Sequence, residues 1–359
     1  MEAPIRVLMI TSGWPQPGQP QTTHFVKRQA EFLRRAGVDV EVFQFRGSRR
    51  LRNYVSSWLK ARPMIRSGRY DLVHAQFGQS GLLALPKRLP LVVTFRGDDI
   101  QGIVSDATGR VALKGRLLQR ACRVVARRAD AVVVVSEHMK AFFDTRAPVT
   151  VLPSGLDLAL FRSVPREEAR RRLGWPLDRR LVLFAGNPEL PRKRFPLAKA
   201  AVDILNRTLP AELIVAWGVP HTEIPLYLSA CDAFVFTSVQ EGSPNVVKEA
   251  LACDLPVVSV PVGDVAERLR TVQGCELCAD DQPETIAAAL ERVLRRGQRV
   301  AGRVAVEQLA EEAITQGLIG VYRAVLASAP AARRAPAASP MLRPYRSEDR
   351  PVADPPRSS

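Results

Sequence analysis

The chain has 359 residues, 46% of them hydrophobic and 25% charged, an ordinary balance for a globular α/β protein large enough to contain two cores. No run of 18 apolar residues occurs, so a transmembrane helix is not expected. The first residues lack the charged-then-apolar layout of a signal peptide, and we expect a cytoplasmic protein.

The net charge of +16 belongs almost entirely to the first half of the chain. Residues 1–165 contain 26 Lys and Arg against 12 Asp and Glu, whereas residues 166–359 contain 26 and 24. The basic stretches 46–69 and 110–128 are either solvated helix faces or a surface that docks on an anionic membrane or a phosphate-bearing lipid. Nucleic acid is not expected as a partner, because no recognition motif or platform of basic and aromatic residues is present.

The five cysteines do not predict a metal site. Cys275 and Cys278 form a single CxxC pair with no second pair and no nearby histidine, and structural zinc requires four ligands. We expect buried or surface thiols and no metal.

The apolar segments form two series of predicted strands. The first comprises residues 5–11, 38–43, 71–76, 91–94 and 131–135, with helical stretches at 22–36, 49–67 and 111–128. The second comprises residues 181–185, 212–217, 233–236 and 256–260. Short apolar strands that alternate with helices indicate parallel sheets covered on both faces, and therefore an α/β protein.

The most informative segment is Glu241-Gly-Ser-Pro-Asn-Val-Val-Lys-Glu249, which lies between a predicted strand and a short apolar helix. A helix that starts near Pro244 or Asn245 directs its free backbone N–H groups and its positive dipole end toward the turn, where they attract a phosphate. Glu241 then lies before the helix and Glu249 about one turn inside it. Two carboxylates beside an anion site are costly unless they bind hydroxyl groups, so the segment indicates a nucleotide-sugar site.

Together with Ala230-Cys-Asp232 before it and residues 250–258 after it, this segment resembles the signature of the retaining GT-B glycosyltransferases of family GT4. The resemblance extends over about residues 4–325. It implies an α/β GT-B fold, in which two Rossmann-like domains with parallel sheets face a central cleft. The acceptor domain is then residues 1–163, the donor domain 164–307, and a helix at 308–327 crosses back to the first domain. Residues 328–359, rich in Pro, Ala, Ser and Arg, are expected to be disordered.

The resemblance also assigns residues to the donor site. Lys193, with Arg192 before it, matches the family's diphosphate-binding lysine, and Asn187 stands where an arginine is usual. In Thr94-Phe-Arg-Gly-Asp-Asp99, Arg96 takes the place of the family's histidine and Asp99 matches its aspartate, while a metal-binding role for the Asp98–Asp99 pair is rejected. Gly13 lies in a loop that matches the family's glycine-rich loop.

Four further positions are less specific. His74 is read as either a packed polar residue or a substrate contact, and Ser154 belongs to a structural hinge motif. His138 and His221 have no partner pattern, and we interpret both as surface or capping residues.

The resemblance implies that a sugar moves from a nucleoside diphosphate sugar to a glycan or lipid-linked acceptor. Glu249 would hold the ribose, Glu241 the sugar, and a donor phosphate oxygen would take the acceptor proton, so no general base, cofactor or metal is assigned. The alternatives are a non-catalytic sugar-nucleotide- or membrane-binding protein and a nucleotide-sugar epimerase. The expected catalytic residues are Glu241, Lys193 and Arg96, and the expected donor-binding residues are Glu249, Gly242, Ser243, Pro244, Asn245, Val246, Arg192, Asn187, Gly13 and Asp99.

Overall fold

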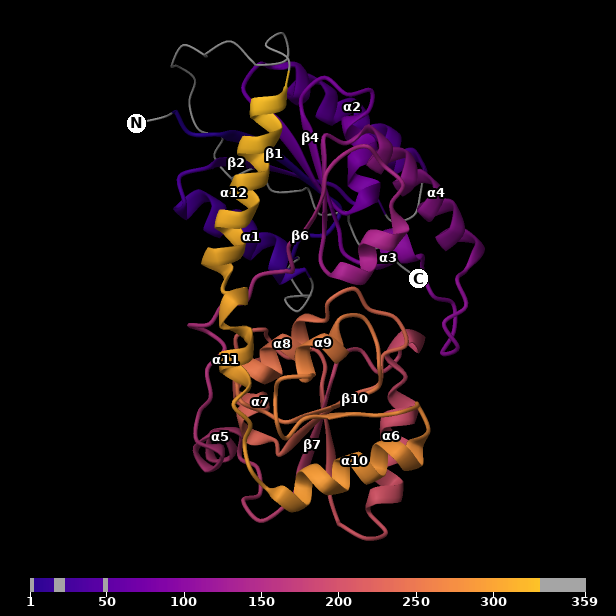
Figure 1. Cartoon of the computed structure of the whole chain (residues 1–359), viewed down its shortest axis with the longest axis vertical. Helices are drawn as coiled ribbons and strands as arrows, with labels where there is room; N and C mark the ends of the chain where they lie inside the picture. The colour runs from indigo at the N-terminus through magenta and orange to yellow at the C-terminus, as the bar shows by residue number, and fades with distance from the viewer. Residues whose placement is uncertain (1–2, 16–22, 48–50, 330–359) are drawn as a thin grey trace, which may run out of the picture.

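The computed structural model describes residues 3–15, 23–47 and 51–329, and these form two α/β units stacked along the long axis of the molecule (Figure 1). The first sheet is parallel, with six strands in the order β2-β1-β3-β4-β5-β6. Its strands are β1 (Arg6–Thr11), β2 (Asp39–Gln44), β3 (Leu72–Gln76), β4 (Leu91–Phe95), β5 (Ala131–Val134) and β6 (Val149–Val151).

The second sheet is also parallel, with five strands in the order β11-β10-β9-β7-β8. Its strands are β7 (Leu181–Ala185), β8 (Glu212–Ala216), β9 (Ala233–Phe236), β10 (Val257–Ser259) and β11 (Glu276–Leu277).

Helices cover both faces of both sheets. Those of the first unit are α1 (His24–Arg35), α2 (Leu51–Arg66), the short helix η1 (Gly78–Ala84), α3 (Asp98–Gln101), α4 (Leu113–Arg128) and η2 (Glu137–Phe142). Those of the second are α5 (Arg166–Leu173), η3 (Pro191–Lys193), α6 (Phe195–Leu205), α7 (Ile224–Ala230), α8 (Asn245–Ala252), α9 (Val265–Leu269) and α10 (Pro283–Arg296). They are followed by α11 (Gly302–Val306), η4 (Glu307–Leu309) and α12 (Glu311–Ser328).

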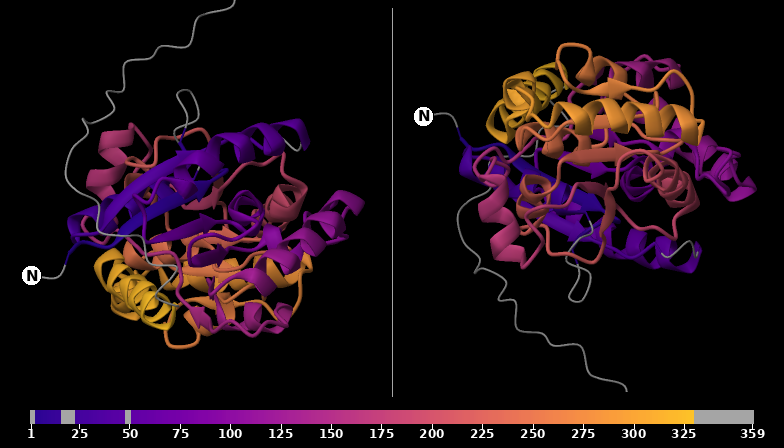
Figure 2. Two further views of the ribbon diagram at one scale, coloured as in Figure 1. Left: turned by 90° about the horizontal axis from the view of Figure 1, so that it is seen from above. Right: turned by 90° about the horizontal axis from the view of Figure 1, so that it is seen from below.

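Alternating side chains of each strand enter different cores. In β1, Leu8 and Ile10 pack with α2, η1 and α4, whereas Val7 and Met9 pack with α1 and α12. In the second sheet, α7 and α8 share one core and α6 and α10 the other. This alternation follows from the two-residue period of a strand. Seen along the long axis, α12 and α4 lie on opposite sides of the molecule (Figure 2).

The last helix returns to the first sheet after the chain has completed the second. On the way, the backbone N–H of Leu156 donates to the carbonyl of Leu309 at 2.8 Å. Within α12, the Tyr322 hydroxyl lies 2.6 Å from Nδ1 of His74, whose Nε2 lies 2.8 Å from the Thr94 hydroxyl. Burial lowers the pKa of His74 to about 3, so this imidazole is neutral and is a packed polar residue under α12.

The predicted disordered tail lies almost entirely outside the described residues, because α12 continues through Ser328 and residues 330–359 are not described. In the part of the chain that is described, no helix combines the length and the apolar character needed to cross a bilayer.

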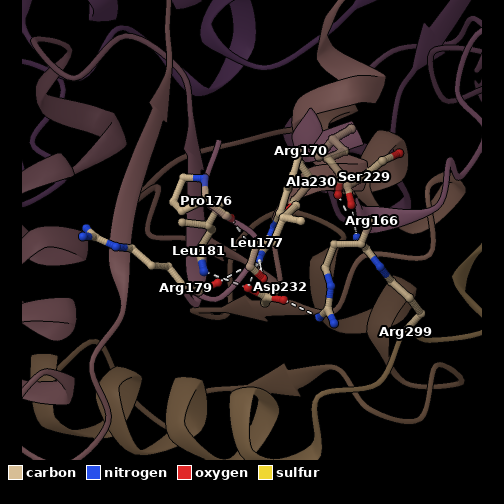
Figure 3. A network of polar contacts seen from close by, with 11 residues as sticks. Arg166, Arg170, Pro176, Leu177, Arg179, Leu181, Ser229, Ala230, Asp232 and Arg299 are labelled. Atoms are coloured by element: carbon tan, nitrogen blue, oxygen red, sulfur yellow. Dashed lines mark hydrogen bonds and ion pairs between the residues drawn. The ribbon is translucent and has the colours of Figure 1, made fainter. Parts of the chain in front are cut away.

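A buried polar network fixes the edge of the second sheet that lies away from the cleft (Figure 3). The guanidinium of Arg170, on α5, donates to four backbone carbonyls and, at 2.7 Å, to the Asp232 carboxylate just before β9. The same carboxylate accepts a hydrogen bond from the backbone N–H of Leu181 at 2.7 Å and forms an ion pair with Arg166. Asp232 therefore joins α5 to two neighbouring strands.

Replacing Asp232 with alanine should lower the free energy of unfolding by about 3–5 kcal/mol, because the change leaves the buried Arg170 cation without its carboxylate. Urea denaturation followed by circular dichroism measures this loss. Glu212→Ala is the matched control, since its ion pair with Arg179 is exposed and should contribute at most about 1 kcal/mol. Equal losses in the two variants would contradict the assignment.

Candidate active site

The carboxyl ends of the two parallel sheets face each other, which is where α/β proteins place their ligands. The loops after β4 and β9 meet here with no space for a side chain. A Cβ atom on Gly242 would lie 2.5 Å from the Arg96 carbonyl oxygen and 2.9 Å from the Val135 side chain. Side-chain amides also join the loops, since Gln240 donates to the Gly102 carbonyl at 2.8 Å. Glycine at 242 therefore sets how closely the units approach.

Glu241 lies between two cations that come from η3, after β7. Its Oε1 accepts hydrogen bonds from Nζ of Lys193 at 2.6 Å and from Arg192 at 2.8 Å. Burial alone would raise the pKa of Glu241, but the charges on Lys193 and Arg192 outweigh it and hold that pKa below its usual range. The carboxylate is therefore ionised at neutral pH, and Arg192 and Lys193 lie beside it at the mouth of the cleft.

Helix α8 begins at Asn245, within the range predicted from the sequence, and follows Pro244. No side chain forms a capping hydrogen bond to the backbone N–H groups of its first turn. The Ser243 hydroxyl donates to Asp264 at 2.8 Å, which holds the turn before the helix. The residues from Gly242 to Val246 thus form the turn and first turn of α8, and this helix end is suited to an anion.

Glu249 is buried inside α8, where its Oε1 lies 3.1 Å from Nε2 of His221. Burial tends to raise the pKa of Glu249, but the hydrogen bond with His221 and the nearby cations Arg28 and Lys248 lower it below the usual range. His221 in turn stacks on His24 of α1, with ring centroids 4.8 Å apart. The interpretation of His221 as a surface or capping residue was wrong, because the tertiary fold brings this loop residue to Glu249.

The loop after β4 uses both of its predicted site residues for internal contacts. The buried Asp99 carboxylate accepts the backbone N–H groups of Gly78, Arg96 and Gly97 at 3.0–3.1 Å. The Arg96 guanidinium donates to the Ser154 hydroxyl at 2.5 Å and to Gln76 at 2.7 Å. Burial lowers the pKa of Arg96 to about 10, so it stays charged. Both residues border the cleft, and their contact with a donor stays a prediction.

The remaining two predicted residues lie in the loops that follow the first strand of each unit. Gly13 follows β1, and a Cβ there would lie 2.7 Å from the Thr23 side chain, which would have to move to make room for it. Asn187 follows β7, and its side-chain oxygen accepts the backbone N–H of Glu189 at 2.9 Å. Residues 16–22 of the predicted glycine-rich loop lie outside the described residues.

Sequence reasoning missed Lys248, although a lysine within an otherwise apolar helix was a usable signal. Its ammonium is buried between the two units and donates to the Ser154 carbonyl at 2.9 Å. Burial lowers its pKa to about 7, while nearby Asp264 partly opposes this shift. In residues 3–15, 23–47 and 51–329, no cluster of His, Cys, Asp and Glu is suited to hold a metal ion.

The stability contributed by position 248 should change with pH. Between pH 7 and the ordinary lysine pKa of 10.5, the unfolded chain keeps the proton that the folded chain loses, so folded-state stability rises with pH. Relative to Lys248→Met, the wild type should gain up to about 1.4 kcal/mol per pH unit in this window and nothing below it. Chemical denaturation from pH 6 to 10 measures the difference, with the exposed Lys199→Met as the control. A pH-independent difference for Lys248→Met would refute the assignment.

Two family models match the chain: Glycosyltransferase Family 4 over residues 2–160 and Glycosyl transferases group 1 over residues 178–296. Among curated proteins, a putative teichuronic acid biosynthesis glycosyltransferase, TuaC of Bacillus subtilis, is 30% identical over 55% of this chain and 54% of its own length. A D-inositol 3-phosphate glycosyltransferase of Thermobispora bispora is 27% identical over 69% of this chain and 68% of its own. The chain belongs to glycosyltransferase family 4.

Solved structures confirm the predicted GT-B fold. A sucrose-phosphate synthase from Thermosynechococcus elongatus superposes with a TM-score of 0.74 at 20% identity, covering 91% of this chain and 100% of that one. HepE from Anabaena, in complex with UDP and glucose, superposes with a TM-score of 0.67 at 18% identity. The match covers 89% of this chain and 100% of HepE.

Proposed function

We propose that this family 4 enzyme is a retaining glycosyltransferase that moves a sugar from a nucleoside diphosphate sugar to a glycan or lipid-linked acceptor. One observation carries the proposal: an uncapped helix end lies between a partly buried and a buried carboxylate, with two cations beside the first. Glu241 and Glu249 are those carboxylates, and Lys193 and Arg192 the cations. A diphosphate with a sugar on one side and a ribose on the other fits this order of charges.

The mechanism assigned to these groups is electrostatic. The bond between the anomeric carbon and the donor phosphate oxygen breaks as the acceptor oxygen bonds to the same carbon, and a donor phosphate oxygen takes the acceptor proton. Negative charge develops on the leaving diphosphate, where Lys193 and the free N–H groups at the start of α8 act on it without having to reorganise. No general base and no metal ion are part of this proposal.

The named relatives support a role in cell-surface polysaccharide or glycolipid synthesis. TuaC is named as a putative teichuronic acid biosynthesis glycosyltransferase, and the Thermobispora protein as a D-inositol 3-phosphate glycosyltransferase. HepE, which shares the fold, was solved with UDP and glucose. A place on the cytoplasmic side of an anionic membrane is part of the same proposal, because the first half of the chain carries most of its positive charge.

Glu249→Ala should abolish the thermal stabilisation that a nucleotide gives the wild type, because Glu249 is assigned to the ribose hydroxyls. The wild type should gain several degrees in Tm with one of UDP, GDP or their common sugar conjugates at saturation. Differential scanning fluorimetry measures both proteins, and Glu312→Ala, an exposed glutamate of α12, is the control that should respond like the wild type. No shift of the wild type with any of these compounds would overturn the proposal.

Glu241→Gln should separate catalysis from nucleotide binding. The substitution keeps the side-chain shape but removes the charge assigned to the sugar end of the donor, so transfer and slow donor hydrolysis should fall by about 10²–10³-fold. Stabilisation by the sugar-free nucleotide should remain, because its ribose and phosphates meet other groups. Hydrolysis of radiolabelled donor measures the rate, and an unchanged rate would remove Glu241 from the site.

A further inference from the structure

A second part of the cleft lies on the first unit and is mostly apolar. A pocket of about 750 Å³ opens between α2 and α4, above η1. Leu51 and Tyr54 of α2 line one side, and Leu117 and Leu118 of α4 the other. At its inner end the same pocket is lined by Asp98, Arg192 and Glu241, so it is continuous with the proposed donor site.

The outer part of this pocket exposes leucines to solvent. Among the described residues, seven large apolar side chains are at least half exposed, and six of them are on α2 and α4. Leu51 is 79% and Leu117 57% exposed, and both line the pocket. Apolar side chains gathered at the mouth of a pocket indicate that an apolar group binds there, because a single-chain protein otherwise keeps such patches small.

The same two helices are strongly basic. Together α2 and α4 contain ten Lys and Arg residues and no Asp or Glu. Lys114, at the start of α4, lines the pocket itself. The surface therefore combines an apolar recess with a positive surround, which complements a molecule that has an apolar tail and an anionic group.

We propose that the pocket between α2 and α4 binds the tail of the acceptor, a lipid whose phosphate carries a hydroxyl-bearing head group. The tail lies against Leu51 and Leu117, the phosphate meets Lys114, and the hydroxyl to be glycosylated reaches the end lined by Asp98 and Glu241. This assignment rests on the proposed glycosyltransferase function and names the class of its acceptor. A bilayer surface alone is a poorer occupant, because a flat surface does not extend to the inner end of the pocket.

The probe is farnesyl phosphate, used below the concentration at which it forms micelles, with titration calorimetry as the readout. The wild type should bind it, and Leu117→Gln should weaken binding at least tenfold, which corresponds to about 1.4 kcal/mol. Val124→Gln is the matched control, because Val124 is a half-exposed apolar residue of the same helix that lies outside the pocket lining. Its dissociation constant should stay within about twofold of the wild type. Leu51→Gln, on the opposite side of the pocket, should weaken binding of farnesyl phosphate to a similar extent.

Two further measurements distinguish binding of the apolar tail from binding of the phosphate. Lys114→Gln should weaken binding of farnesyl phosphate about tenfold but leave binding of farnesol unchanged, and inorganic phosphate alone should not bind measurably at this site. Nucleotide stabilisation of each variant serves as the check that it is folded, and Leu117→Ala replaces Leu117→Gln if that variant fails this check.

Three results would overturn the inference. The first is a wild type that is stabilised by nucleotide yet does not bind farnesyl phosphate, which leaves the donor site intact and removes the tail site. The second is an equal loss of binding in Leu117→Gln and Val124→Gln. The third is flotation with vesicles of 70% phosphatidylcholine and 30% phosphatidylglycerol without binding of the free lipid, which identifies a membrane-docking surface instead. Absence of any nucleotide shift would instead count against the proposed function.

Discussion

The relative position of the two units depends on a buried cluster of charges around the linker at Ser154 and Gly155. The guanidinium of Arg28 donates to the Gly155 carbonyl at 2.7 Å and to the Glu311 carboxylate at 2.8 Å. Lys248 and Arg96 donate to the carbonyl and the hydroxyl of Ser154. Buried charges are tolerated only when they are paired and hydrogen-bonded, so a displacement of either unit would leave several of them unsatisfied.

The linker cluster and the proposed donor site share one helix. In α8, Lys248 reaches the linker while its neighbour Glu249 meets His221 on another side of the same turn. His221 then stacks on His24, so this contact also crosses between the units. Because α8 carries both contacts, its position relative to the first sheet fixes where the carboxylates of the cleft stand. Gly242 completes this arrangement by letting the loops touch.

Most of the fold could be predicted from the sequence, because parallel strands buried on both faces leave short apolar runs that are easy to recognise. The predicted strands at 181–185 and 233–236 match β7 and β9, and the start of α8 was also predicted. Strands β6 and β11 were missed, because they are only three and two residues long and carry little periodic signal. The motif containing Asp232 was recognised, but its place in the structural network of the second sheet was not.

The sequence by itself determined the family, the α/β class and the spacing of Glu241 and Glu249, because these are properties of neighbouring residues in one strand, turn and helix. Only the tertiary structure decided which side chains from distant segments meet. It paired Glu249 with His221 and Glu241 with Lys193 and Arg192, directed Arg96 to the linker, and buried Lys248. The physical reason is that hydrogen bonds and desolvation act over a few ångströms in space, and local residue patterns do not encode these long-range approaches.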